Sequence, residues 1–113
     1  MSNKLVEEIK KEILGNKYEL SLAFVNKEKI KKVNSEYRKK DEPTDVLSLS
    51  LSKNSGEILI CKEIAKLKSK SFKMEPKKYL NFLVIHAILH LKGLKHGDKM
   101  ERAEKKLISK FNL

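Results

Sequence analysis

Residues 76–96 read PKKYLNFLVIHAILHLKGLKH, and this stretch contains all three histidines of the chain. Its central part, residues 79–91, is apolar on nearly all sides, which predicts a helix buried in the protein core. Pro76 suits the first turn of such a helix, where its missing N–H costs nothing. Gly93 suits a left-handed cap at the other end. We therefore expect one long buried helix followed directly by a turn.

The spacing of the histidines predicts a metal site on this helix and the loop after it. His86 and His90 are four residues apart and project from one helical face, and a turn at Gly93 brings His96 back toward them. Three protein ligands leave a fourth position open, which is typical of catalytic rather than structural zinc. Alternatively, each histidine is a core residue satisfied by its neighbours. However, two imidazoles on one face of a buried helix are costly unless something binds them. We predict one Zn²⁺ held by His86, His90 and His96, other divalent metals being possible.

The residue after the first histidine narrows the chemistry. In the protease motif H-E-x-x-H that place holds a glutamate that serves as general base. Here it holds Ala87. A hydrolase built on this motif must rely on its metal, or on another residue, to activate water. Peptide hydrolysis is therefore disfavoured, and attack on a phosphodiester remains open.

Length and composition predict one folded domain spanning residues 1–113. Hydrophobic residues make up 40% of the 113-residue chain, enough for a modest core. The single cysteine, Cys61, cannot form an internal disulfide, and we expect it to be buried at a strand end in a protein of the reducing cytosol. The first residues carry charges where a signal peptide needs an apolar run, and no stretch is long enough to span a membrane. These features predict a cytoplasmic protein without a membrane partner.

The net charge of +11 is compatible with a nucleic-acid partner but does not establish one. All but two of the 26 basic residues are lysine, a skew that a general lysine bias would also produce. The excess lies at the two ends: residues 1–40 carry eleven basic and six acidic groups, and residues 76–113 carry nine and three. The middle of the chain is balanced. Lysines on helix faces are usually just solvated, so charge alone leaves the question open.

Arg38 stands out because nearly every other positive charge is lysine. Its planar guanidinium can bind phosphate or carboxylate in a bidentate manner. It closes a helical pattern and opens a polar turn, where pairing with Asp41 or Glu42 is the simpler alternative. Both roles are compatible, since an acid can orient a residue that binds substrate. The other arginine, Arg102, lies next to Glu101 in an amphipathic pattern and is expected at the surface.

Local patterns place eight elements along the chain in the order α, β, α, β, β, α, α, α. They predict a small α+β domain with a three- or four-stranded sheet and about five helices. The second and third strands are expected to form a hairpin. Its Ser48-Leu49-Ser50 stretch is expected to form one wall of a groove. The expected bounds are helix 3–14, strand 18–25, helix 26–37, strand 46–51, turn 53–56, strand 57–61, helix 62–71, the histidine helix from 76, and helix 99–111 capped by Asp98.

Three ordered motifs resemble those of the YbeY family of endoribonucleases and rRNA maturation factors. The pattern H-x3-H-L-x-G-x-x-H of residues 86–96 resembles that family's histidine motif. Residues 37–48, YRKKDEPTDVLS, look like its second signature, and residues 56–61, GEILIC, resemble its third. Together they cover most of residues 37–96, which is far more specific than a lone pair of histidines.

The resemblance implies a zincin-like hydrolase that uses one metal ion, usually taken as zinc, to cleave single-stranded RNA. It implies roles in small-subunit rRNA maturation and ribosome quality control, with rRNA, the small subunit and assembly proteins as partners. The three metal ligands correspond to His86, His90 and His96, and the functionally important arginine to Arg38. We further expect three substrate-binding residues within the second signature, of which the second is also a candidate general acid: Lys40, Asp45 and Ser48.

Two other functions remain open from the sequence. One is a non-catalytic RNA-binding factor of ribosome assembly, in which the metal only ties the last loop to the helix. The other is a metallopeptidase, which Ala87 disfavours.

The chain also departs from the family pattern. Ala87 replaces the usual glycine, and Leu94-Lys95 replaces an aromatic residue and an acid before the last histidine. The missing carboxylate raises the question of which acid orients a ligand, and Asp98 is the candidate that the sequence offers. Leu49-Ser50 replaces a Phe-Pro pair, so the strand is expected to continue without a break.

Overall fold

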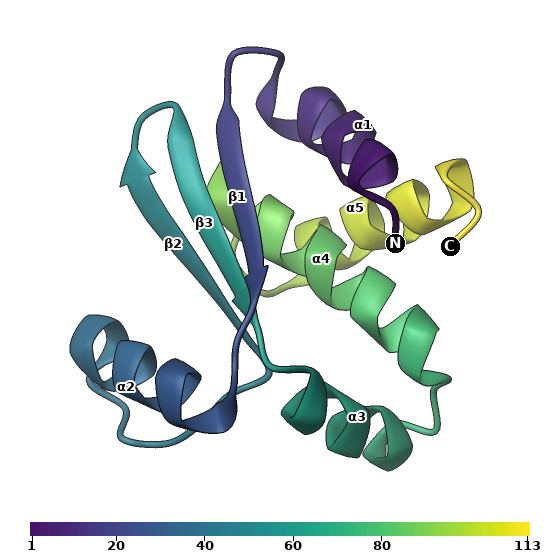
Figure 1. Ribbon diagram of the computed structural model, residues 1–113. Helices are drawn as coiled ribbons and strands as arrows, with labels where there is room; N and C mark the ends of the chain where they lie inside the picture. The colour runs from purple at the N-terminus through teal and green to yellow at the C-terminus, as the bar shows by residue number, and fades with distance from the viewer.

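The computed structural model describes residues 1–113 and contains three strands and five helices in the predicted order (Figure 1). The α+β class is thereby confirmed. No helix combines the length and the apolarity needed to cross a membrane. In chain order the elements are α1 (Asn3–Leu14), β1 (Glu19–Phe24), α2 (Lys27–Arg38), β2 (Val46–Ser52), β3 (Ser55–Ile60), α3 (Lys62–Ser71), α4 (Pro76–Lys92) and α5 (Asp98–Lys110).

The helix ends lie where capping chemistry predicts them. The Asn26 side chain accepts a hydrogen bond from the backbone N–H of Lys29 and opens α2. Gly15 ends α1, and Gly93 ends α4 with a φ of 105°, a left-handed value that glycine adopts without strain. Pro76 occupies the first turn of α4.

The sheet has the strand order β1-β3-β2, so β3 is central. β2 and β3 form the predicted antiparallel hairpin, with Leu47 opposite Leu59. β1 runs parallel to β3, with Leu22 opposite Ile58. The α2 helix lies in the long connection between β1 and the hairpin, as a parallel pairing requires.

Side chains of β3 alternate between the two faces of the sheet and join two cores. Ile58 and Ile60 belong to a buried cluster with α1, α4 and α5, whereas Leu59 belongs to a second cluster with α2 and β2. The α4 helix thus packs on one face of the sheet and also contacts α1, α3 and α5, whereas α2 covers the other face (Figure 1). Burial of its apolar faces fixes both the position and the rotation of the helix that carries the first two histidines.

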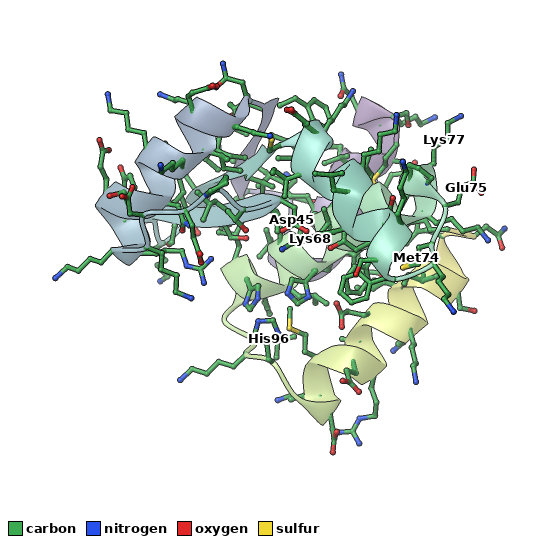
Figure 2. The ribbon with its side chains drawn as sticks, turned by 90° about the horizontal axis from the view of Figure 1, so that it is seen from below. Asp45, Lys68, Met74, Glu75, Lys77 and His96 are labelled. Carbon is green, nitrogen blue, oxygen red and sulfur yellow. The ribbon has the colours of Figure 1, made fainter.

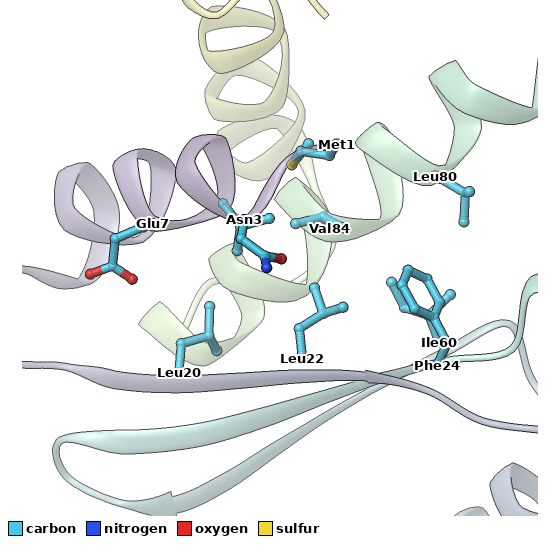
Figure 3. Close-up of a pocket in the computed structure, with 10 residues that line it drawn as sticks. Met1, Asn3, Glu7, Leu20, Leu22, Phe24, Ile60, Leu80 and Val84 are labelled. Atoms are coloured by element: carbon cyan, nitrogen blue, oxygen red, sulfur yellow. The ribbon is translucent and has the colours of Figure 1, made fainter.

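An apolar hollow of about 250 Å³ lies between the start of α1, β1 and α4. Figure 3 shows Leu20 and Leu22 on the strand facing Val84 on α4. None of the histidines lines it.

Leu47 and Leu49 are buried on one face of β2, but Leu51 is 60% exposed, because the register shifts between Ser50 and Ser52. Three expected positions are corrected by the structure. Gly56 lies within β3 rather than in the turn, so the hairpin turn is shorter than predicted. The last helix begins at Asp98, and the residue at the cap position is Gly97.

Candidate metal centre

The two histidines of α4 lie on one helical face, and the loop after Gly93 brings the third beside them. The Nε2 atoms of His86 and His90 are 3.1 Å apart. One ligand nitrogen from each of His86, His90 and His96 lies within 4.8 Å of the others. Their ring centroids are 4.6 to 4.9 Å apart. The structure thus brings together the three histidines that their spacing indicated, and these residues can hold a metal ion.

The second ring nitrogens of the helical pair are held by acceptors on the protein. His86 Nδ1 lies 2.7 Å from Oε2 of Glu104 on α5, and His90 Nδ1 lies 3.0 Å from the carbonyl oxygen of Leu94. Each acceptor favours a proton on Nδ1 and leaves the Nε2 lone pair free. Metal-binding histidines show this pattern, in which the outer partner fixes the tautomer and the ring orientation. The donor set therefore fits a divalent ion that prefers nitrogen ligands, such as zinc.

Electrostatics also favour an uncharged His90. Burial lowers the pKa of His90 below its usual value, and the neighbouring positive charges of His86, His96 and Arg38 lower it further. The hydrogen bond to the Leu94 carbonyl opposes these effects without reversing them. A neutral imidazole is the form that binds a metal, so less proton competition has to be overcome at this position.

A polar cleft of about 580 Å³ opens over the histidines. Arg38 lines it from the end of α2, and Lys68 lines it from α3. Arg38 is exposed and forms no ion pair with Asp41 or Glu42, so its guanidinium is free to contact a ligand. Ser48 and Ser50 lie on the β2 wall, together with Asp45 and Thr44 just before it.

Asp45 is anchored rather than free. Its side chain is 6% exposed. Its Oδ2 accepts a 2.7 Å hydrogen bond from the Tyr79 hydroxyl, and its Oδ1 lies 3.5 Å from the Lys68 ammonium. Figure 2 shows Asp45 and Lys68 side by side near His96. Burial, and then the hydrogen bond and charge of Asp45, raise the pKa of Tyr79 far above its ordinary value. These contacts favour a role for Asp45 in positioning Lys68 at the cleft and in holding Tyr79 of α4 next to it.

Two further residues named from the sequence take different places. The Ser48 hydroxyl donates a 3.1 Å hydrogen bond to the carbonyl oxygen of Ala87, which ties β2 to the turn of α4 between the two helical histidines. Lys40 is exposed and does not line the cleft. Asp98 is the first residue of α5, but the acid that contacts a histidine is Glu104.

Sequence reasoning missed three residues of the site: Glu104, Lys68 and Tyr79. Each lies on a predicted helix, but its partner is distant in sequence. The heptad-like pattern of α5 offered one signal, because Glu104 lies on the same side as the inward-facing Met100 and Leu107. An acid at such a position is expected to have a buried partner.

Three imidazoles converging beside a cationic cleft on an α+β scaffold define a small protein with a candidate single-metal site. The model of the endoribonuclease YbeY family matches residues 1–112. The chain therefore belongs to the YbeY endoribonuclease family, as the motifs indicated.

Individual relatives agree with this assignment. The chain is 36% identical over 109 residues to the endoribonuclease YbeY of Staphylococcus epidermidis, covering 84% of this chain and 70% of that protein. It is 43% identical over 105 residues to the endoribonuclease YbeY of Thermotoga neapolitana, covering 92% of this chain and 69% of that protein. The solution structure of TM1509 from Thermotoga maritima matches with a TM-score of 0.69 and 31% identity, over 96% of this chain and 77% of that one.

Proposed function

We propose that this protein is a metal-dependent endoribonuclease that cleaves single-stranded RNA, with His86, His90 and His96 as its metal ligands. The observation that carries the proposal is the convergence of three imidazole nitrogens within 4.8 Å beside a cleft lined by Arg38 and Lys68. The names of its relatives support the same activity.

The side chains around the cleft have different roles in the proposed reaction. When bound, a zinc ion supplies an activated water and a Lewis acid at the phosphate. Arg38 binds the phosphate with its planar guanidinium and offsets the charge that develops on the phosphate oxygens. Lys68 adds a second positive charge, which Asp45 holds in place at 3.5 Å. Glu104 keeps the His86 ring oriented through Nδ1.

The cleft also favours an unpaired strand as substrate. An unpaired backbone can bend into a concave site and turn its bases outward, whereas an A-form duplex cannot. Within the cell we propose that the substrate is rRNA of the small ribosomal subunit, during maturation and during removal of defective ribosomes in the cytoplasm. Assembly proteins on the ribosome are the proposed partners. The motif resemblance of residues 37–96 supports this narrower role.

Two variants and a matched control test the assignment. His90→Ala should lose bound zinc and cleavage together, because one of three ligands is gone. Arg38→Glu should keep its zinc and lose cleavage of single-stranded RNA by at least a hundredfold, since phosphate binding and charge stabilisation are both removed. Arg102→Glu makes the same charge change on the exposed face of α5 and should retain both properties. Zinc is measured by elemental analysis of protein purified without chelator, and cleavage on labelled single-stranded and duplex RNA.

The outcomes separate the proposal from its alternatives. Unchanged zinc in His90→Ala would overturn the ligand assignment. Full rRNA processing by Arg38→Glu, with unfolding on zinc removal, would instead support a non-catalytic assembly factor. Cleavage of a peptide mixture would indicate a peptidase, although Ala87 stands where such an enzyme needs its glutamate.

A further inference from the structure

A second hollow of about 610 Å³ lies next to the cleft, between α3, α4 and α5. The two cavities share part of their lining, including Lys68, His86 and His96. They are therefore neighbouring parts of one depression, with His86 and His96 at the junction. A ligand bound across the histidines must extend into this second part or stop at its edge.

One wall of the second hollow is a row of rings that leads to the histidines. Phe72 stacks on Tyr79 with ring centroids 5.8 Å apart, Tyr79 on Phe82 at 6.2 Å, and Phe82 lies 5.5 Å from the His86 ring. The interplanar angles are 27°, 30° and 31°, so each ring is moderately inclined to the next. The outermost ring, Phe72, is 62% exposed. Exposure of a large ring beside a candidate active site leaves a free aromatic face for a ligand.

The charges around this hollow select what can occupy it. Lys68 lies at the junction with the cleft together with its buried partner Asp45, whereas Glu101 and Glu104 line the α5 side. Carboxylates repel a phosphate but tolerate an uncharged aromatic group. A phosphate therefore fits the cleft beside Lys68 and Arg38, and an uncharged flat group fits the hollow beside Phe72. A nucleotide has both parts, joined by a short linkage.

We propose that the second hollow binds an unpaired nucleobase of the RNA strand whose phosphate lies in the cleft, and that Phe72 stacks on this base. The inference rests on the proposed function and extends it by naming a base-binding subsite. Met74, 36% exposed at the same hollow, supplies a polarisable edge to the subsite. Stacking on an exposed ring tolerates every base, so the subsite favours unpaired over paired RNA without strict sequence preference.

Binding to a backbone with and without bases tests this subsite. The ligands are a 2′-O-methyl phosphorothioate oligoadenylate, which resists cleavage, and an abasic oligomer of the same length and backbone. Isothermal titration calorimetry with zinc-loaded protein gives both affinities. Phe72→Leu should weaken oligoadenylate binding about fivefold, the low end for loss of one stacked base, and leave abasic binding unchanged. Phe72→Tyr keeps the ring and should bind like the parent.

A matched control is Phe24→Leu, the same substitution at another exposed phenylalanine, which lies outside both cavities. It should leave both affinities unchanged. Equal weakening of oligoadenylate and abasic binding by Phe72→Leu would overturn the stacking, as would no weakening at all. If Phe72→Leu weakens neither affinity, the result would instead indicate that the hollow binds an apolar side chain of a protein partner. Failure of the parent protein to bind either oligomer would overturn the proposed function as well, so the two failures are distinguishable.

Discussion

Glu104 shows how one buried acid can decide the state of a histidine. It is 7% exposed, and its Oε2 lies 2.7 Å from His86 Nδ1. The contact joins α5 to α4 and acts behind the ring, on the side away from the converging Nε2 atoms. The sequence predicted the three histidines from their spacing alone. It could not predict Glu104, because that contact depends on the angle at which α5 packs on α4.

We predict that Glu104→Gln lowers zinc affinity about tenfold, since loss of an outer carboxylate partner makes His86 a weaker ligand. The amide oxygen can still accept the Nδ1 proton, so the protein should remain folded. Competition with a chromogenic chelator measures the affinity, and circular dichroism verifies the fold. Glu101→Gln removes the same charge from an exposed position one turn earlier and serves as the control. Equal losses in the two variants would show that net charge, rather than the His86 contact, sets the affinity.

At the scale of the elements, α4 and the turn after it form the site together. Gly93 has a φ of 105°, and the turn that it starts places the Leu94 carbonyl on His90 and brings His96 to the cluster. Gly15 has a similar φ of 98° at the end of α1, far from the histidines in sequence and outside the cleft. A Cβ at either glycine would meet no atom within 4 Å. Both positions therefore have room for a Cβ. They differ because only the turn at Gly93 leads to a histidine of the cluster.

Replacement of either glycine by alanine should cost about 1 kcal/mol of unfolding free energy, because a left-handed backbone is strained for any residue with a Cβ. Gly93→Ala should in addition weaken zinc binding, since relief of the strain moves the loop that carries His96. Gly15→Ala should bind zinc like the parent. Urea denaturation and chelator competition give the two quantities. Unaltered zinc affinity in Gly93→Ala would show that the loop is positioned by other contacts.

The elements were predictable where their signals were local. Gly15, Asn26, Pro76 and Gly93 each act on the few residues around them, and the helix bounds followed accordingly. The pairing of strands and its register were harder to predict from the sequence. The exposure of Leu51 and the place of Gly56 within β3 depend on the register of the hairpin. The parallel pairing of β1 with β3 joins residues more than thirty positions apart, which no local pattern reports.

At the scale of the whole molecule, a net charge of +11 can act on RNA in two ways. It can attract a polyanion to the entire surface, or a few cations can contact phosphates directly. At physiological ionic strength the screening length is about 8 Å, so charges outside the cleft contribute little to a bound phosphate. Arg38 lines the cleft, and Arg102 lies exposed on α5 outside it. Replacing either by glutamate lowers the net charge equally, from +11 to +9.

The salt dependence of RNA binding therefore separates the two cases. For single strands, log affinity falls with log salt concentration by about 0.7 per phosphate contact. Arg38→Glu should reduce this slope by roughly that amount and weaken binding at least tenfold, because one phosphate contact is replaced by repulsion. Arg102→Glu should keep the slope of the parent protein. Titrations of a cleavage-resistant oligoadenylate between low and physiological salt measure both slopes. Equal changes in the two variants would assign RNA binding to the overall charge, and the cleft would then lose its role as the phosphate site.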